Sequence, residues 1–135
     1  MRIMTVMAVV FGAGFAGAAQ AQTVDCDNAI TQMEMNACAA SAFNAADKDL
    51  NAAYARARSA MRRIDGELSA SQAGAETALR DAQRAWITFR DNACLAEGFQ
   101  MRGGSAEPLL VFGCKARLTE QRAQDLWTLA AGIEG

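Results

Sequence analysis

The four cysteines have the clearest chemical meaning in this chain, because its composition removes most other reactive groups. The sequence contains no histidine, which excludes histidine-based acid–base catalysis, serine–histidine nucleophiles and histidine-rich metal sites. Cys26, Cys38, Cys94 and Cys114 are even in number, and in an exported protein such a set forms disulfides. Bridged cysteines supply no thiolate nucleophile. We therefore expect two disulfides, no catalytic residue, no metal and no cofactor.

The first 22 residues are the reason to expect export. Arg2 precedes an apolar run over residues 3–18, and Ala19-Gln20-Ala21 matches the small-x-small pattern after which signal peptidase cuts. The run is shorter than the roughly 20 residues that span a bilayer, and no cysteine directly follows the small residues, as a lipoprotein signal requires. We expect residues 1–22 to be a cleaved signal peptide. Residues 23–135 then form one domain, periplasmic or secreted, without a membrane anchor.

The charge of the mature chain narrows the class of partner. Loss of Arg2 with the signal peptide removes one of 13 basic residues and none of the 15 acidic residues, so 13 − 1 − 15 leaves a net charge of −3. This mild acidity argues against nucleic acid or anionic lipid as the main partner. It is compatible with a basic protein partner.

Three stretches with an apolar repeat of three to four residues predict the helices that position the cysteines. The first begins near a capping box formed by Thr31 and Glu34 and closes at Asp65-Gly66. The second ends at Glu97-Gly98, and the third begins at Pro108, a residue tolerated in a first helical turn. No stretch alternates with a period of two over the length of a strand. The sequence therefore predicts an all-α fold: a three-helix antiparallel bundle with a short N-terminal segment, stapled by two disulfides.

The apolar repeats also predict which side chains form the core. The first helix should bury Phe43, Ala46, Leu50, Tyr54, Ala57, Met61 and Ile64. The second should bury Leu79, Ala82, Trp86, Phe89 and Ala93. The third should bury Leu110, Cys114, Leu118, Leu126, Leu129 and Ile133, and Trp127 is also expected in the core. Ser69 or Ser71 is expected to cap the second helix, and Ser105 or Glu107 the third.

The pairing of the cysteines has three alternatives from sequence alone. If the second helix descends from about residue 74 and the third climbs from about residue 108, Cys94 and Cys114 lie at similar heights beside the connecting turn. Cys38 then falls well below Cys94, and it is nearer to Cys26 if the N-terminal segment folds back on the helix. The geometry favours Cys26–Cys38 and Cys94–Cys114.

Several polar and aromatic side chains lie in or beside the apolar repeats: Asp47, Asn51, Tyr54, Arg84, Trp86, Arg90 and Arg122. One interpretation is a polar groove between the helices. The other is structural, with Asp47 paired to an arginine and hydrogen bonds that set the helix register. The structural interpretation is favoured, because half-buried charges in proteins are normally paired.

The segment between Gly98 and Pro108 is the candidate contact loop. It links two helices beside a disulfide, and a loop held at both ends loses less conformational entropy when it enters a partner's cleft. The alternative is a plain connector. The candidate contact residues are Phe99, Met101, Arg102, Gly103, Gly104, Ser105 and Glu107.

Several motifs together resemble the LprI-type lysozyme inhibitor domain over nearly the whole mature chain. They are Glu34-Met-Asn-Ala-Cys38, Asp47-Lys-Asp-Leu-Asn-Ala-Ala-Tyr54, Gln83-Arg-Ala-Trp-Ile-Thr-Phe-Arg-Asp91, Gly103-Gly-Ser105 and Thr119-Glu-Gln-Arg122. The resemblance implies a small, exported, helical and disulfide-bonded protein, and the composition, without histidine, argues against enzymatic activity. The resemblance also implies a protein partner, lysozyme. It supplies no inhibitory motif that can be carried onto individual residues of this chain.

The resemblance and the composition together lead to one expected function and one alternative. The expected function is a lysozyme-inhibitor-like binding protein that occludes the active cleft of lysozyme-type muramidases without cofactor or covalent chemistry. The alternative is a non-catalytic periplasmic accessory or structural domain that binds another envelope protein.

Overall fold

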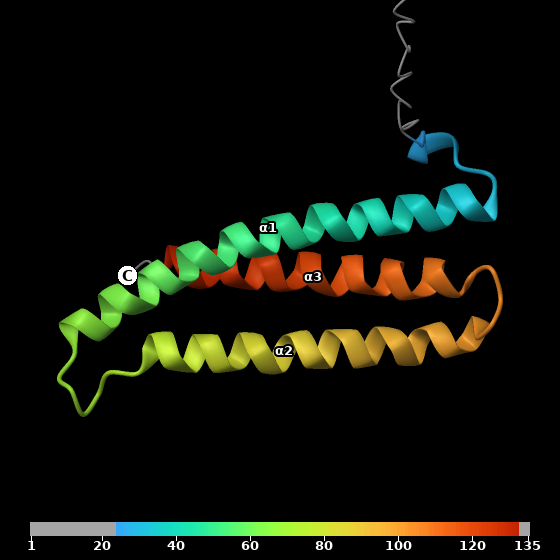
Figure 1. The fold of residues 1–135 in the computed structure, drawn as a ribbon. Helices are drawn as coiled ribbons and strands as arrows, with labels where there is room; N and C mark the ends of the chain where they lie inside the picture. The colour runs from blue at the N-terminus through green and yellow to red at the C-terminus, as the bar shows by residue number, and fades with distance from the viewer. Residues whose placement is uncertain (1–23, 133–135) are drawn as a thin grey trace, which may run out of the picture.

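The computed structural model describes residues 24–132, which form three long helices in an up-down-up order (Figure 1). The elements are η1 (Cys26–Asn28), α1 (Gln32–Glu67), α2 (Ala75–Gly98), η2 (Phe99–Met101) and α3 (Glu107–Ala131). The predicted all-α bundle with two disulfides is confirmed, and no strand occurs in the described range. The predicted signal peptide and the expected core residue Ile133 lie outside the described residues.

The start of α1 follows the predicted capping box. The Thr31 hydroxyl accepts a hydrogen bond from the Glu34 backbone N–H at 3.2 Å, and the Glu34 carboxylate accepts one from the Thr31 N–H at 2.9 Å. These bonds satisfy amides of the first turn that have no partner within the helix. The bonds from the Thr31 backbone and side chain also hold the pKa of Glu34 below its usual value.

The start of α2 differs from the serine cap expected from the sequence. Ser69 and Ser71 bond to each other across the turn, at 3.1 Å. The Asp65 carboxylate at the end of α1 instead accepts hydrogen bonds from the first amides of α2, including those of Gly74 at 2.8 Å and Ala75 at 2.7 Å. A carboxylate at a helix N-terminus satisfies free amides and opposes the helix dipole. A residue nine positions upstream therefore replaces the local serine as the cap.

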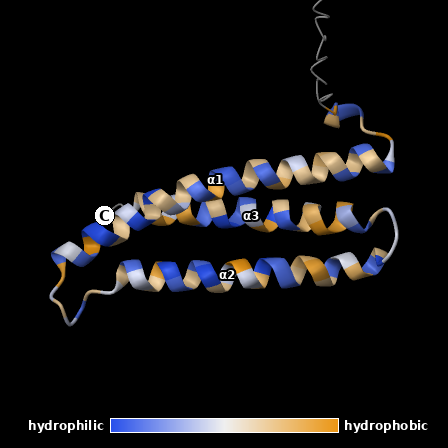
Figure 2. Ribbon diagram, viewed as in Figure 1, coloured by the Kyte–Doolittle hydropathy of each residue, from blue (hydrophilic) through white to orange (hydrophobic). Residues whose placement is uncertain are grey.

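The core lies mainly between α1 and α3, which share the largest interhelical interface. The hydropathy colouring in Figure 2 shows hydrophilic and hydrophobic residues interleaved along all three helices, as amphipathic helices require. Small side chains on α1 let α3 approach closely. The core cluster consists of Leu50, Ala53, Ala57, Ala60, Met61, Leu79, Ala123 and Leu126.

The predicted apolar repeat of α2 is wrong at two positions. Phe89 is 60% exposed and Ala82 is also exposed, whereas Gln83 and Arg90 are buried. The buried face of α2 therefore differs from the predicted apolar face by a rotation about the helix axis. Burial of Gln83 and Arg90 is tolerated because polar groups on the other helices bond to them. The apolar pattern alone carries no information about those partners.

The C-terminal half of α3 departs from prediction in the same way. Trp127 and Leu129 are each 40% exposed, and the indole N–H of Trp127 donates to the Asp49 carboxylate at 3.1 Å. Thr119 and Ala123, which the predicted repeat omits, are fully buried. Because Thr119 and Ala123 are small and buried, α1 and α3 come close together there. The Trp127 indole lies at the edge of the α1–α3 interface, partly in solvent.

Candidate functional site

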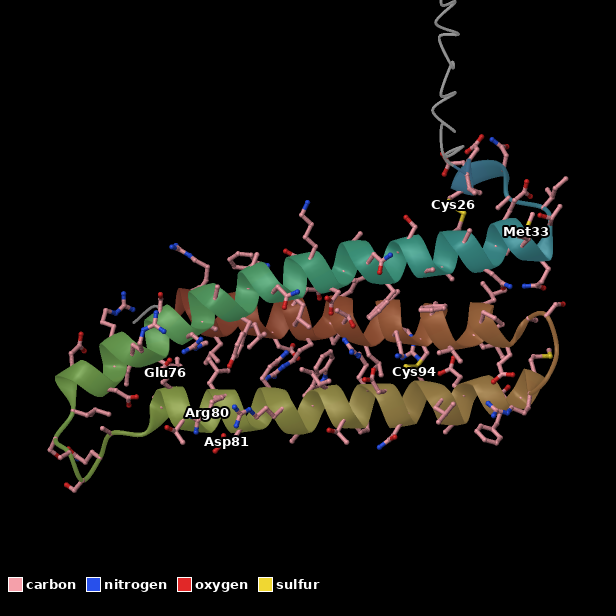
Figure 3. All side chains as sticks on the ribbon, in the orientation of Figure 1. Cys26, Met33, Glu76, Arg80, Asp81 and Cys94 are labelled. Carbon is pink, nitrogen blue, oxygen red and sulfur yellow. A yellow bond between two sulfur atoms is a disulfide. The ribbon has the colours of Figure 1, made fainter. Side chains whose placement is uncertain are left out.

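Both disulfides have the predicted connectivity. Cys26 pairs with Cys38 at a Cα–Cα distance of 5.6 Å, and Cys94 pairs with Cys114 at 5.4 Å. The expectation that Cys38 lies well below Cys94 is wrong: α1 begins at the end of the bundle where α2 finishes, so both bridges belong to that end (Figure 3). Cys26 is exposed, whereas Cys94 and Cys114 are buried. At this end of the bundle, one disulfide therefore joins the N-terminal segment to α1 and the other joins α2 to α3.

Gly98 ends α2 where α3 comes very close. A Cβ atom at this position would lie 2.5 Å from Val111 Cγ2, so a larger residue would push the two helices apart. The neighbouring Cys94–Cys114 bridge joins the same two helices. The α2–α3 corner is thus closely packed before the loop begins.

The loop after η2 is held by Glu107 at the start of α3. Its carboxylate accepts a hydrogen bond from the Gly103 backbone N–H at 2.8 Å and pairs with the Arg102 guanidinium at 2.7 Å. The Gly103 bond, followed by the Arg102 contact, holds the pKa of Glu107 below its usual value. Gly103 has a φ of +77°, a conformation that glycine adopts without strain. Glu107 thus closes the loop on itself rather than capping α3 from the position expected.

A second contact joins this loop to α1. The Asn36 side-chain amide donates to the Ser105 backbone carbonyl at 2.9 Å, and Gln32 donates to the Asn36 side-chain oxygen at 2.8 Å. Ser105 therefore contributes its carbonyl to α1 and does not cap α3, whose first turn has no side-chain cap. Pro108 lies in that first turn, as predicted.

The fixed loop leaves large side chains in solvent. Phe99 is 58% exposed and Met101 is 52% exposed, although they belong to a short 3-10 helix next to a buried disulfide. The Arg102 guanidinium lies 4.7 Å from the centre of the Phe99 ring, within the range of a cation–π contact. Gly103, Gly104 and Ser105 are also exposed. The arrangement is suited to non-covalent protein binding.

Two further exposed residues were missed by sequence reasoning. Ile30 is 86% exposed and Met33 is 78% exposed, both at the start of α1. Met33 lies three residues before Asn36, whose side chain contacts the loop at Ser105, so it belongs to the same end of the bundle as the loop. No sequence signal indicated this exposure. Ile30 directly precedes the cap, where an apolar residue ordinarily packs against the first turn, yet it lies in solvent.

Three of the polar residues in the apolar repeats, Asp47, Asn51 and Arg90, are bonded to one another. Arg90, only 7% exposed, reaches Asp47 on α1 at 3.4 Å and Asp91 at 3.0 Å, and it contacts the Thr119 hydroxyl on α3 at 3.5 Å. One guanidinium therefore links all three helices. Asn51, one turn further along α1, donates to the other Asp47 oxygen at 3.2 Å.

Aromatic rings complete the surroundings of this guanidinium. Its central carbon lies 5.1 Å from the centre of the Phe43 ring and 5.2 Å from that of Trp86. Stacking on two rings offsets part of the lost hydration of the charge. Arg90 thus occupies a polar and aromatic environment that ordinary apolar packing does not supply.

The remaining candidate residues are spread along the bundle. Arg122 donates to the buried Gln83 at 3.0 Å, joining α3 to α2. Tyr54 is half-buried beside the core with Arg58 5.9 Å from its ring centre, and Arg84 is exposed. They do not converge on one groove. Within residues 24–132, no group of three or more acidic or cysteine side chains is arranged to hold a metal ion.

An apolar cavity lies elsewhere. It has a volume of about 450 Å³ and is lined by Met61, Ile64, Thr128, Leu129 and Gly132, from α1 and the C-terminal part of the described chain. None of the candidate contact or polar residues reaches it. The part of the chain that the structure describes also has no helix with the length and apolarity needed to cross a bilayer.

Comparisons with known proteins agree with this architecture. The chain is 45% identical over 119 residues to an uncharacterized protein of Rhizobium meliloti, covering 86% of each chain. It is similar to the crystal structure of a DUF1311 family protein from Pseudomonas putida, with a TM-score of 0.65 and 27% identity, covering 76% of this chain and 97% of the other. Residues 25–126 match the family model described as "Lysozyme inhibitor LprI". This chain therefore belongs to the LprI lysozyme inhibitor family.

Proposed function

We propose that this protein is an exported, non-catalytic inhibitor that binds lysozyme-type muramidases and occludes their active cleft. The contact loop is the segment from Phe99 to Glu107. The proposal depends on one observation about this loop. A disulfide, Glu107 and Asn36 hold its backbone, yet the side chains of Phe99 and Met101 remain more than half exposed to solvent. Family membership supplies the class of target.

Physical chemistry favours this loop as a binding element. A backbone that is already ordered loses little entropy on entering a cleft. Aromatic, methionine and arginine side chains are the types enriched at the centres of protein interfaces. Occlusion of the cleft needs no nucleophile, metal or cofactor, so the absence of histidine from the sequence is no obstacle.

The test is inhibition of c-type, g-type and i-type lysozymes by the oxidised mature protein, with Phe99→Ser as the loop variant. We expect inhibition of at least one class by the wild type, and a loss of at least about tenfold in affinity for the variant, which is equivalent to about 1.4 kcal/mol. Phe89→Ser is the matched control, because Phe89 lies on α2, away from the loop, and is 60% exposed against 58% for Phe99.

Two results would contradict the proposal. Full activity of all three lysozyme classes at micromolar excess of the protein would exclude inhibition. Equal weakening by Phe99→Ser and Phe89→Ser would exclude the loop as the contact. If no lysozyme is inhibited and a pull-down from periplasmic extract returns one other envelope protein, the accessory-domain alternative is supported instead.

A further inference from the structure

Exposed apolar side chains gather at the end of the bundle that holds both disulfides. Half of the large apolar residues exposed within residues 24–132 belong to this end: Val24, Ile30, Met33, Leu95, Phe99 and Met101. We define the disulfide-end surface as Ile30, Met33, Phe99 and Met101 together with the carboxylates of Asp25 and Asp27. The Asn36–Ser105 hydrogen bond joins its two parts, the start of α1 and the contact loop.

The same end carries the excess negative charge of the chain. Residues 24–38 contain three acidic residues and no basic one, and residues 95–107 contain two acidic residues and Arg102. Arg117 pairs with Glu97 at 3.1 Å, so five acidic and two basic residues leave a net charge of −3. Elsewhere in residues 23–135, ten acidic and ten basic residues balance. The complementary partner surface is therefore basic.

The N-terminal part of this surface is held in place by local bonds. The Cys26–Cys38 bridge fastens η1 to α1, and Asp25 accepts hydrogen bonds from the Asp27 N–H at 3.1 Å and from Asn28 at 2.7 Å. The capping box then fixes the turn into α1 directly after Ile30. Ile30 and Met33 are presented to solvent from an ordered backbone, as Phe99 and Met101 are.

We infer that the docking face is the whole disulfide-end surface and that it recognises a basic protein. Ile30 and Met33 act as apolar anchors at the same end of the bundle as the contact loop, and Asp25 and Asp27 attract the partner's positive charge. This inference rests on the proposed function and extends it, because it assigns lysozyme contacts to the start of α1 that the loop alone does not supply.

The apolar half is tested with the double variant I30S/M33S, bound to whichever lysozyme class the wild type inhibits. We expect the Kd to rise at least tenfold while the Tm stays within a few degrees, since both side chains already lie in solvent. The matched control is I87S/F89S, which removes two exposed apolar side chains from the middle of α2. It should leave the Kd unchanged.

The charged half is tested with Asp27→Asn in stopped-flow association at low and high salt. We expect the association rate constant to fall about twofold to threefold at low salt, and the difference from wild type to disappear as salt screens the charges. Glu120→Gln, an exposed carboxylate on α3, is the control and should change neither value.

A further readout does not depend on any variant. Hydrogen exchange of the lysozyme complex should show protection of residues 24–36 together with residues 98–107. If the wild type inhibits lysozyme but I30S/M33S binds as tightly as wild type and residues 24–36 gain no protection, this inference is wrong and the loop proposal stands. If the wild type binds no lysozyme, the proposed function fails and the inference fails with it.

Discussion

Arg90 shows how a single residue can contradict an apolar repeat and still stabilise the core. Its side chain is buried in the middle of α2, where the sequence pattern alone places Phe89. Burial of a charge is costly unless partners replace the lost water. Two carboxylates, a threonine hydroxyl and two aromatic rings, contributed by all three helices, supply that replacement.

We predict that Arg90→Met lowers the free energy of unfolding by about 1–3 kcal/mol, because Asp47 and Asp91 lose the guanidinium and keep only Asn51 and Lys115 as bonded partners. Arg90→Lys should recover only part of the loss, since a compact ammonium cannot bond in several directions as a planar guanidinium does. Urea unfolding measures both. Arg84→Met, at an exposed position of the same helix, is the control, and an equal loss there would contradict this role for Arg90.

The first turn of each of the three helices is stabilised in a different way. The helices therefore differ in how far their start depends on residues elsewhere in the chain. α1 uses its own capping box, α2 uses Asp65 from the preceding helix, and α3 begins with Glu107 and Pro108 and no side-chain cap. α1 therefore specifies its own start. α2 depends on the turn that places Asp65 against its first amides, and its arginine contacts through Glu76 strengthen the same α1–α2 corner.

We predict that Asp65→Asn lowers the Tm at neutral pH. Hydrogen bonds from the backbone N–H groups of Glu76, Gly74 and Ala75 hold the pKa of Asp65 below its usual 3.8 in the folded protein. A lowered folded pKa means that the carboxylate stabilises the fold above the unfolded pKa, and that this stability is lost as the pH falls through the folded pKa. The Tm difference between wild type and variant should therefore be full above about pH 5 and shrink below the unfolded value.

Thermal unfolding of both proteins at a series of pH values from neutral to acidic measures this effect. A Tm difference that stays constant across the series would show that the Asp65 charge does not act as the cap. Asp81→Asn serves as the control, because Asp81 lies on the exposed face of α2 and pairs only with the neighbouring Arg80 among the contacts described.

At the scale of the whole molecule, the two disulfides have different surroundings although they share one end. The Cys94–Cys114 bridge lies in the packed interface of α2 and α3, whereas Cys26 is exposed on the N-terminal segment. Each bridge closes a loop of moderate length and is worth about 3 kcal/mol by chain-entropy reasoning. Their accessibility to a reducing thiol nevertheless differs, because exchange requires in-line approach to a sulfur.

We predict that mild reduction opens Cys26–Cys38 before Cys94–Cys114. Alkylation followed by mass spectrometry identifies the labelled cysteines, and the partly reduced protein should keep its helical circular dichroism while it binds lysozyme more weakly. A C26A/C38A variant should reproduce that state. Labelling of Cys94 and Cys114 first would contradict the prediction.

The sequence by itself determined the fold class, the capping box of α1 and, through helical rise, the Cys94–Cys114 pair. The Cys26–Cys38 pair was also predicted, although the height assigned to Cys38 in that prediction is wrong. These features depend on residues near one another in the chain or on a regular repeat. Only the tertiary structure decided which face of α2 is buried, that Asp65 caps α2, and that both bridges meet at one end. It also showed that Ile30 and Met33 remain in solvent at the end of the bundle that carries the contact loop. Each of these outcomes depends on groups that different helices bring together, and a one-dimensional pattern of apolar and polar residues does not contain those distances.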